Sequence, residues 1–281
     1  MRHSETELKK IANDLRIDVL RMGPESGNAI HIGPSYSCTE IITVLYNEIL
    51  NINPKDPNWF DRDRFIISKG HATPVLYAQL AQLGYFDREQ LWDVKNVDCI
   101  LQGHPCMLTT PGIDMNSGSL GNGLPVALGM AIGLKQMKNK ASVFVLVGDG
   151  EFQEGATLEA MMAAPNKGAD NLTVVLDYNH HQSAGSVEDI MPLHPLADKW
   201  KSFGWNVMEV DGHNIPDLYS KLAIAKNFMG RPTCIIAHTI KGKGISFMEN
   251  NNAWHVKLPS EDEYTRGMEE LENIDSSLSK Q

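Results

Sequence analysis

The sequence predicts an α/β protein whose mostly parallel sheet is covered by helices on both faces. Strand-like apolar runs occupy residues 142–147, 172–177, 206–210 and 233–237. They alternate with helical stretches near 151–164, at 195–203 and at 216–229. Regular alternation of this kind is typical of a parallel sheet. No internal repeat or linker interrupts it, so we expect residues 1–281 to form a single domain that ends in an acidic helix or tail at 261–281.

The N-terminal half contributes the remaining predicted elements. Apolar positions at helical spacing predict a helix over residues 5–22 that ends at Gly23-Pro24, and Ser37–Glu40 resembles a capping box before a second helix. Phe65–Ile67 predicts a short buried strand, and Gly123–Met137 predicts a helix rich in small residues. Residues 102–122 are rich in Gly, Pro, Ser and Thr; a loop of this length indicates function or disorder.

Composition excludes several classes of protein. The formal net charge of -10 argues against nucleic acid as the main partner. The four cysteines form no CxxC pair, so neither a disulfide framework nor a zinc site is indicated. The N-terminus lacks an apolar signal region, and no apolar run approaches the ~20 residues of a membrane span. We expect a soluble, cytoplasmic protein that does not bind a membrane.

Polar residues follow several of the predicted strands. Gly148-Asp149-Gly150 ends one apolar run, and Asn179 follows the next, thirty residues after Asp149. Ligands bind outside the carboxyl ends of parallel strands, where Asp211-Gly212-His213 and His238 also fall. Asp149, the side-chain carbonyl of Asn179 and a backbone carbonyl, that of His181, offer oxygen ligands for magnesium. A glycine turn before a helix offers N–H groups to the phosphates of a cofactor.

Simpler interpretations compete with this one. Gly-Asp-Gly alone is an ordinary strand-to-helix turn, and Gln153 stands where a dinucleotide fingerprint requires glycine. Lys241-Gly242-Lys243-Gly244 fits either a phosphate loop or, more simply, a flexible solvated basic turn. Four histidines lie in loops where function is favoured over a structural role, because loop backbone approaches ligands closely; they are His31, His71, His104 and His255.

These residues resemble a known family. Gly148-Asp149-Gly150 with Asn179 is similar to the thiamine-diphosphate motif. Three further segments resemble transketolase, and the likeness extends from about residue 8 to residue 260; the segments are Asp63–His71, Gly118–Gly123 and His238–Gly244. The resemblance implies a three-layer thiamine-diphosphate-binding fold, with the chain as its diphosphate-binding domain, and thiamine diphosphate and Mg2+ as cofactors.

The resemblance also implies roles for single residues. Asp149, Asn179 and the His181 carbonyl would hold magnesium. His31 and His104 would bind sugar hydroxyls or move protons, and His71 and His255 would act near the diphosphate. Glu154 would belong to a carboxylate network across the subunit interface. The other implied cofactor contacts are Gly118, Ser119, Leu120, Gly148, Gly150 and Glu151.

The length of the chain departs from the family pattern. A full-length transketolase continues into a pyrimidine-binding domain that supplies the activating glutamate and most contacts to the substrate phosphate. The resemblance therefore implies the N-terminal subunit of a split transketolase that is inactive without a separately encoded partner. We expect an α2β2 heterotetramer that transfers a two-carbon ketol unit from a ketose phosphate or sulfonate to an aldose.

Two other functions stay open at this point. The thiamine-binding subunit of a 2-oxo acid dehydrogenase shares Asp149 and Asn179 but has no need of the four loop histidines. A catalytically silent regulatory subunit is the other alternative, although intact metal-ligand residues and histidines argue against loss of activity.

Overall fold

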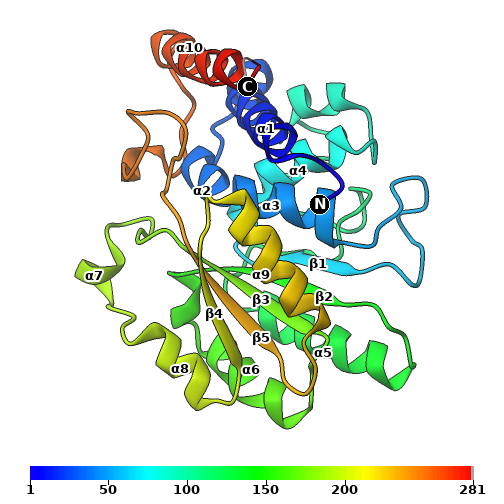
Figure 1. Ribbon diagram of the computed structural model, residues 1–281. Helices are drawn as coiled ribbons and strands as arrows, with labels where there is room; N and C mark the ends of the chain where they lie inside the picture. The colour runs from blue at the N-terminus through cyan, green and yellow to red at the C-terminus, as the bar shows by residue number, and fades with distance from the viewer. Residues whose placement is uncertain (280–281) are drawn as a thin grey trace.

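The computed structural model describes residues 1–279 and contains a five-stranded parallel sheet (Figure 1). The strands lie in the order β1-β2-β3-β5-β4, and every neighbouring pair is parallel. Their bounds are β1 (Arg64–Ile67), β2 (Val143–Gly148), β3 (Leu172–Tyr178), β4 (Asn206–Asp211) and β5 (Thr233–His238). The predicted parallel sheet is confirmed, and each predicted strand is found to within one residue at either end.

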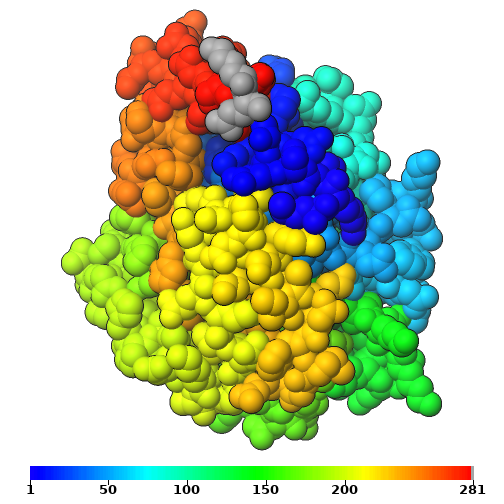
Figure 2. Space-filling view, in the orientation of Figure 1, coloured from blue at the N-terminus to red at the C-terminus, as the bar shows by residue number. Residues whose placement is uncertain are grey.

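Helices cover both faces of this sheet. Figure 2 views the molecule from one of these sides, where the segment containing α9, in yellow, lies below α1, in blue. The helices on this side are α1 (Glu5–Ser26), α3 (Thr39–Val44), α4 (Thr73–Gln82) and α9 (Ile215–Asn227). The opposite side carries α5 (Gly123–Gln136), α6 (Gly155–Asn166) and α8 (Leu196–Ser202).

Side-chain alternation along the strands produces two hydrophobic cores. In β2, Phe144 and Leu146 pack into the core under α1 and α9, whereas Val143, Val145 and Val147 pack into the core under α5 and α6. Successive side chains of a strand point to opposite faces, so a fully apolar strand requires cover on both. This arrangement confirms the predicted three-layer α/β fold.

Two predicted helix boundaries in the N-terminal half are wrong. Helix α1 does not end at Gly23-Pro24 but continues to Ser26, where Gly27 caps it with φ 71°. Pro24 has no N–H for the carbonyl of Leu20, so the helix loses one backbone hydrogen bond there but continues for two more residues. Ser37 does not begin a capping box, since it already ends helix α2 (Ile32–Ser37). Its hydroxyl instead donates to Asp177, over 2.6 Å.

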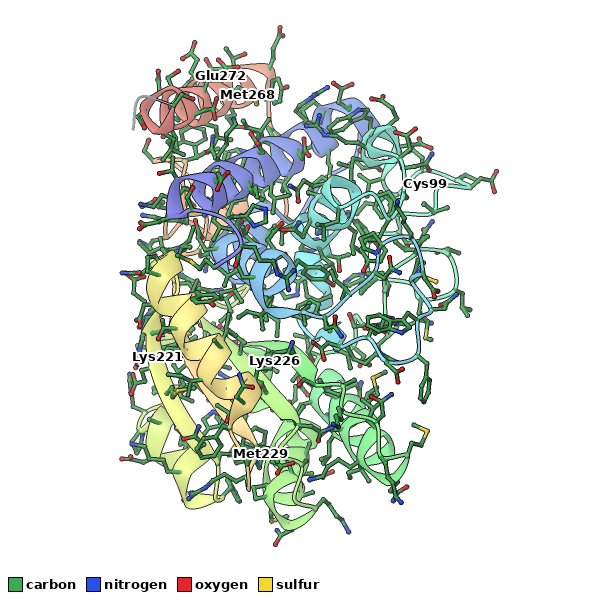
Figure 3. All side chains as sticks on the ribbon, turned by 45° about the vertical axis from the view of Figure 1, so that its right-hand side comes forward. Cys99, Lys221, Lys226, Met229, Met268 and Glu272 are labelled. Atoms are coloured by element: carbon green, nitrogen blue, oxygen red, sulfur yellow. The ribbon has the colours of Figure 1, made fainter. Side chains whose placement is uncertain are left out.

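The C-terminal segment forms α10 (Glu261–Leu278), which begins with three acidic residues and a capping box from Ser260. Figure 3 shows α10, with Met268 and Glu272 labelled, beside α1. Among residues 1–279, no helix combines the length and the apolar character that crossing a membrane requires.

Short helical turns lie in the loops of the described chain. They are the π-helix η1 (Leu45–Ile49), the 3-10 helices η2 (Gly70–Ala72), η3 (Arg88–Asp93), η4 (Glu151–Gln153) and η5 (Asn252–Trp254), and α7 (Val187–Ile190). Residues 102–122 contain no helix or strand, as predicted. This loop is tied to the carboxyl end of β1 by the Ser117 hydroxyl, which donates to the Ile67 carbonyl over 2.7 Å. It therefore reaches the edge of the sheet where ligands of parallel sheets bind.

Candidate functional site

A cavity of about 350 Å³ lies at the carboxyl edge of the sheet. Loops that follow β1, β2, β3 and β5 all contribute to its wall, which is why residues far apart in sequence meet there. The residues that line it are Pro34, Lys69, His71, Gly118, Leu120, Gly148, Asp149, Gly150, Glu151, Gln153, Glu154, Asn179, His181, Gln182, Ser183, Lys241 and His255.

Asp149 is held rigidly in this wall. Its side chain is buried, and its two carboxylate oxygens accept hydrogen bonds from the backbone N–H groups of Gly150 and His180, each over 2.7 Å. Burial, with the Asp177 carboxylate nearby, raises the pKa of Asp149 to about 7. A buried carboxylate of this kind is stabilised in its ionised form by a cation.

Asn179 lies beside Asp149, as the sequence predicts. Its amide group donates to Asp177 over 3.3 Å and to Ser37 over 3.4 Å. Its side-chain oxygen accepts from the backbone N–H of His181 over 3.0 Å. These contacts fix which end of the carboxamide is the oxygen, and they bring the three predicted magnesium ligands, Asp149, Asn179 and His181, to one wall.

The wall also contains an ion pair that the sequence did not predict, between Lys69, which lines the cavity, and Asp177 behind it. Lys69 and Asp177 are 1% and 0% exposed, and the Lys69 ammonium donates to the Asp177 carboxylate. The same ammonium donates to the Pro34 carbonyl over 3.0 Å, while Ser37 and Thr239 donate to Asp177. The sequence did hold a signal for this pair, since Lys69 and Asp177 carry opposite charges near the ends of two apolar strands, β1 and β3. A charge buried in such a position requires a partner of opposite sign.

The interpretation of Lys241–Gly244 as a flexible, solvated basic turn is wrong for Lys241. It is not a solvated basic residue but is 1% exposed and lines the cavity. Its ammonium donates to the Gln182 carbonyl and to the Asn252 side-chain oxygen, both over 3.0 Å. Burial and the neighbouring Lys69 lower the pKa of Lys241 to about 8. A buried cation next to a cavity favours an anionic ligand, which is the phosphate-loop alternative.

The four loop histidines form one cluster beside the cavity. Ring centroids of His31 lie 5.5 Å from His71, 6.1 Å from His104 and 5.5 Å from His255. His71 and His255 lie 5.1 Å apart and line the cavity, whereas His31 and His104 stand behind them. Burial is the main cause that lowers the pKa of His31 to about 3 and that of His255 to about 4, so these imidazoles are neutral at pH 7.

The remaining predicted contacts differ in their placement. Gly118 and Leu120 line the cavity, but Ser119 between them is exposed and does not. Gly118 has φ 145°, and a Cβ there would lie 3.2 Å from the His104 ring, so glycine lets this loop approach the histidine cluster.

Two acidic residues follow Gly150 in the same wall. The buried Glu151 carboxylate accepts from Ser68 and from the N–H groups of Gly121 and Gly148, and so it joins three loops rather than offering free oxygens. Glu154 is exposed at the rim of the cavity.

Two polar strand ends noted in the sequence do not line the cavity. His238 is partly exposed and pairs with Glu209 over 2.8 Å. His213 is partly buried against Glu40, with Nδ1 and Oε2 2.9 Å apart. Within residues 1–279, no three His, Cys, Asp or Glu side chains are grouped as a metal site. A magnesium site here would use one carboxylate together with amide and backbone oxygens.

Comparison with known proteins agrees with this geometry. Residues 8–271 match the family model for the thiamine diphosphate binding domain of transketolase. The chain is 41% identical over 242 residues to a 6-deoxy-6-sulfo-D-fructose transketolase subunit of a Clostridium species, covering 86% of this chain and 88% of that protein. It is 41% identical over 271 residues to an apulose-4-phosphate transketolase subunit of Actinobacillus succinogenes, covering 96% and 98%.

Solved structures lead to the same family. The transketolase of Campylobacter jejuni superposes with a TM-score of 0.89 at 29% identity, covering 96% of this chain but 43% of that one. The chain thus spans less than half the length of this transketolase, and most of the length of the relatives that are named as subunits. This chain belongs to the transketolase family, within which it matches the thiamine diphosphate binding domain.

Proposed function

We propose that this chain is the cofactor-binding subunit of a split transketolase, which transfers a two-carbon ketol unit from a ketose to an aldose. The observation that carries the proposal is the cluster of four histidines, with the pKa of each lowered mainly by burial, beside the cavity that contains Asp149 and Asn179. Neutral imidazoles can accept and donate protons, as bonds to sugar hydroxyls require. A 2-oxo acid substrate has no such row of hydroxyls.

The polar atoms of the cavity suit the diphosphate of thiamine diphosphate. Ring nitrogens of His181 and His255 and the amide nitrogen of Gln182, all from residues that line the cavity, are buried without a hydrogen-bond partner in the described chain. Buried polar atoms are normally satisfied, so these nitrogens favour a ligand rich in acceptor oxygens. The Lys241 ammonium adds a positive charge in a protein whose net charge is -10.

The same wall offers residues that would hold magnesium, which would supply positive charge beside the diphosphate. Asp149, the Asn179 side-chain oxygen and the His181 carbonyl are oxygen ligands of the kind that Mg2+ prefers. A divalent cation would also offset the burial that raises the pKa of Asp149. The metal would neutralise part of the diphosphate charge.

The residues of this chain would position the sugar and transfer protons to and from its oxygens, while the cofactor supplies the reactive carbon. Bound thiamine diphosphate provides the nucleophile and the electron sink for carbon–carbon cleavage and formation. His71 and His255 line the cavity where the ketose would meet that carbon, and they would hold or move protons at its oxygens. His31 and His104 would orient hydroxyls farther along the sugar.

The uncovered surface of α5 and α6 supports a partner subunit. Residues 123–134 of α5 contain no charged side chain, yet Val126 is 38% exposed; on α6, Leu158 and Met162 are 39% and 52% exposed. An apolar helix surface of this kind is normally buried. Both helices begin beside cavity-lining residues, so a partner on this surface would also close the cavity and cover Glu154.

The assembly and the substrate follow from the same reasoning. If each partner completes one site and the dimer of the family is retained, the complex is an α2β2 heterotetramer. The two relatives are named for 6-deoxy-6-sulfo-D-fructose and for apulose 4-phosphate. We propose a donor ketose that carries an anionic group, and an aldose acceptor.

The test is reconstitution with the partner chain. The purified subunit should show no ketol transfer alone, and transfer should appear when the pyrimidine-domain subunit, thiamine diphosphate and Mg2+ are added. Oxidation of pyruvate, rather than cleavage of a ketose phosphate or sulfonate, would instead identify a dehydrogenase subunit. Absence of Mg2+-dependent cofactor binding by the reconstituted pair would identify a silent subunit.

A further inference from the structure

The segment that carries Lys241 needs support from outside the cavity. Residues 239–244, here called the Lys241 loop, follow β5, and within the described chain the Lys241 ammonium contacts no carboxylate. Its own hydrogen bonds, to the Gln182 carbonyl and to Asn252, are to neutral groups. Backbone hydrogen bonds hold the loop at Lys241 and Gly242, from the Asn250 N–H to the Lys241 carbonyl over 2.8 Å and from the Gly242 N–H to the Gly33 carbonyl over 3.0 Å.

Two side chains outside the cavity hold this loop on both sides of Lys241. The backbone N–H of Ile240, one residue before Lys241, donates to Nε2 of His213 over 2.9 Å. The backbone carbonyl of Lys243, two residues after Lys241, accepts from Nε of Arg16 over 2.8 Å. Arg16 lies on α1 and His213 in the turn between β4 and α9, so the two contacts come from segments far apart in the sequence.

Glu40 joins these two contacts into one unit. One carboxylate oxygen accepts from Arg16 over 2.6 Å, and the other lies 2.9 Å from Nδ1 of His213. Because the backbone N–H at 240 can only donate, Nε2 of His213 must accept, and its proton must reside on Nδ1 and point at Glu40. The carboxylate thus fixes the tautomer that binds the loop, in the way that carboxylates fix the tautomer of metal-bound histidines.

The loop is shaped to fit these contacts. Gly244 has φ 106°, and a Cβ there would lie 2.9 Å from Cδ of Arg16. Gly242 has φ 79°, and a Cβ there would lie 2.3 Å from the Met248 carbonyl oxygen. Both glycines are required where they stand, because a side chain would push the backbone off Arg16 or off the following turn.

We propose that Arg16, Glu40 and His213 act as a clamp that positions Lys241 toward the diphosphate of the cofactor. The inference rests on the proposed function, since the anion that Lys241 faces is the cofactor diphosphate. None of the three side chains lines the cavity, so they are positioning residues. Their contribution to binding passes through the Lys241 ammonium.

The decisive experiment is a double-mutant cycle on cofactor affinity. Thiamine diphosphate with Mg2+, and separately inorganic diphosphate, are titrated by calorimetry into the reconstituted two-subunit complex. The variants are His213→Leu, Lys241→Met and the two combined. Lys243→Met is the matched control, because it removes a lysine of the same loop whose ammonium pairs with Glu249 over 3.2 Å and does not line the cavity.

Lys241→Met is expected to weaken binding of both ligands about tenfold or more, as for loss of a charged hydrogen-bond donor. His213→Leu is expected to weaken it by roughly fivefold to tenfold alone, but less than about twofold when Lys241 is already methionine, because coupled residues are not additive. His213→Gln should recover most of the affinity, since its side-chain oxygen can accept from the Ile240 N–H. Lys243→Met should change nothing.

Equal weakening by His213→Leu in both backgrounds would overturn the clamp and indicate a general structural role. An unchanged affinity of His213→Leu would also overturn it. If His213→Leu does not fold, the same cycle is run with Glu40→Gln, which leaves an acceptor for Arg16. Failure of the unaltered complex to bind either ligand would overturn the proposed function, and the clamp with it.

Discussion

Replacing Asp177 by asparagine breaks a buried ion pair, and we expect a large loss of stability. Asp177 and Lys69 are 0% and 1% exposed, so water cannot solvate the ammonium that loses its partner. Removing one member of a buried pair costs about 3–5 kcal/mol. Asparagine has nearly the same shape as aspartate, so no cavity contributes to that loss.

The size of this effect makes it measurable. A loss of about 4 kcal/mol is a large share of the roughly 5–15 kcal/mol that stabilises a typical protein, and it corresponds to a fall in Tm of roughly 10 °C for a chain of this size. Urea unfolding, followed by the fluorescence of the five tryptophans, gives the free energy of unfolding directly. Since its partners lower the pKa of Asp177, the stability that the unaltered protein gains from this carboxylate should be constant between about pH 5 and pH 8.

The control is to remove both charges. Lys69→Met combined with Asp177→Asn leaves no uncompensated charge, so the double variant should be more stable than Asp177→Asn alone. A cost of less than about 1 kcal/mol for Asp177→Asn, the range of an exposed pair, would contradict the assignment of a buried ion pair. Additive destabilisation by the two substitutions would contradict it equally.

Three other perturbations test the site and the proposed interface. A Cβ at Gly129 on α5 meets nothing within 4 Å, so Gly129→Leu should leave the free chain as stable or more stable. The variant should nevertheless abolish co-sedimentation with the partner, whereas the control Ser220→Leu, on the exposed surface of α9, should not. Unchanged association of Gly129→Leu would contradict the α5 interface. Chelation by EDTA, or Asp149→Ala, should weaken thiamine diphosphate binding about tenfold or more, whereas Asp198→Ala should not; equal affinity with and without chelator would exclude the metal. Because the pKa of His255 is lowered to about 4 and the unfolded value is about 6.5, the stability of its neutral form is present above pH ~6.5 and is lost as pH falls toward the folded value. The urea concentration at the unfolding midpoint should therefore decrease as the pH is lowered across that range, and it should decrease less steeply in His255→Asn. Identical pH dependence in the two proteins would contradict the burial argument.

The fold was predictable because its signals are local. An apolar run such as 142–147 has both faces buried, and only a parallel sheet with helices on each side buries both. The misplaced boundaries at Pro24 and Ser37 arise where a local signal competes with its surroundings. The helix continues past Pro24 to the cap at Gly27 in spite of the backbone hydrogen bond that proline removes, and the Ser37 hydroxyl donates to Asp177 instead of capping a helix.

Within the site, a residue could be placed from the sequence when it comes directly after the end of a strand. Asp149 and Asn179 each follow the end of a strand, so their proximity followed from parallel pairing alone. Lys241 was misjudged because a basic, glycine-flanked turn has the same sequence whether it lies in solvent or over a cavity. Only its burial under the Gln182 and Asn252 segments separates the two.

Local patterns in the chain were enough to establish the α/β class, the succession of strands, and the carboxylate and amide at neighbouring strand ends. The packing of distant segments was needed to gather four histidines from four loops into one cluster and to pair Lys69 with Asp177. It was also needed to bring Arg16, Glu40 and His213 to the Lys241 loop. The difference is one of range. Strand propensity and glycine turns act over a few residues, whereas the partner of a buried charge depends on which remote segments pack against it.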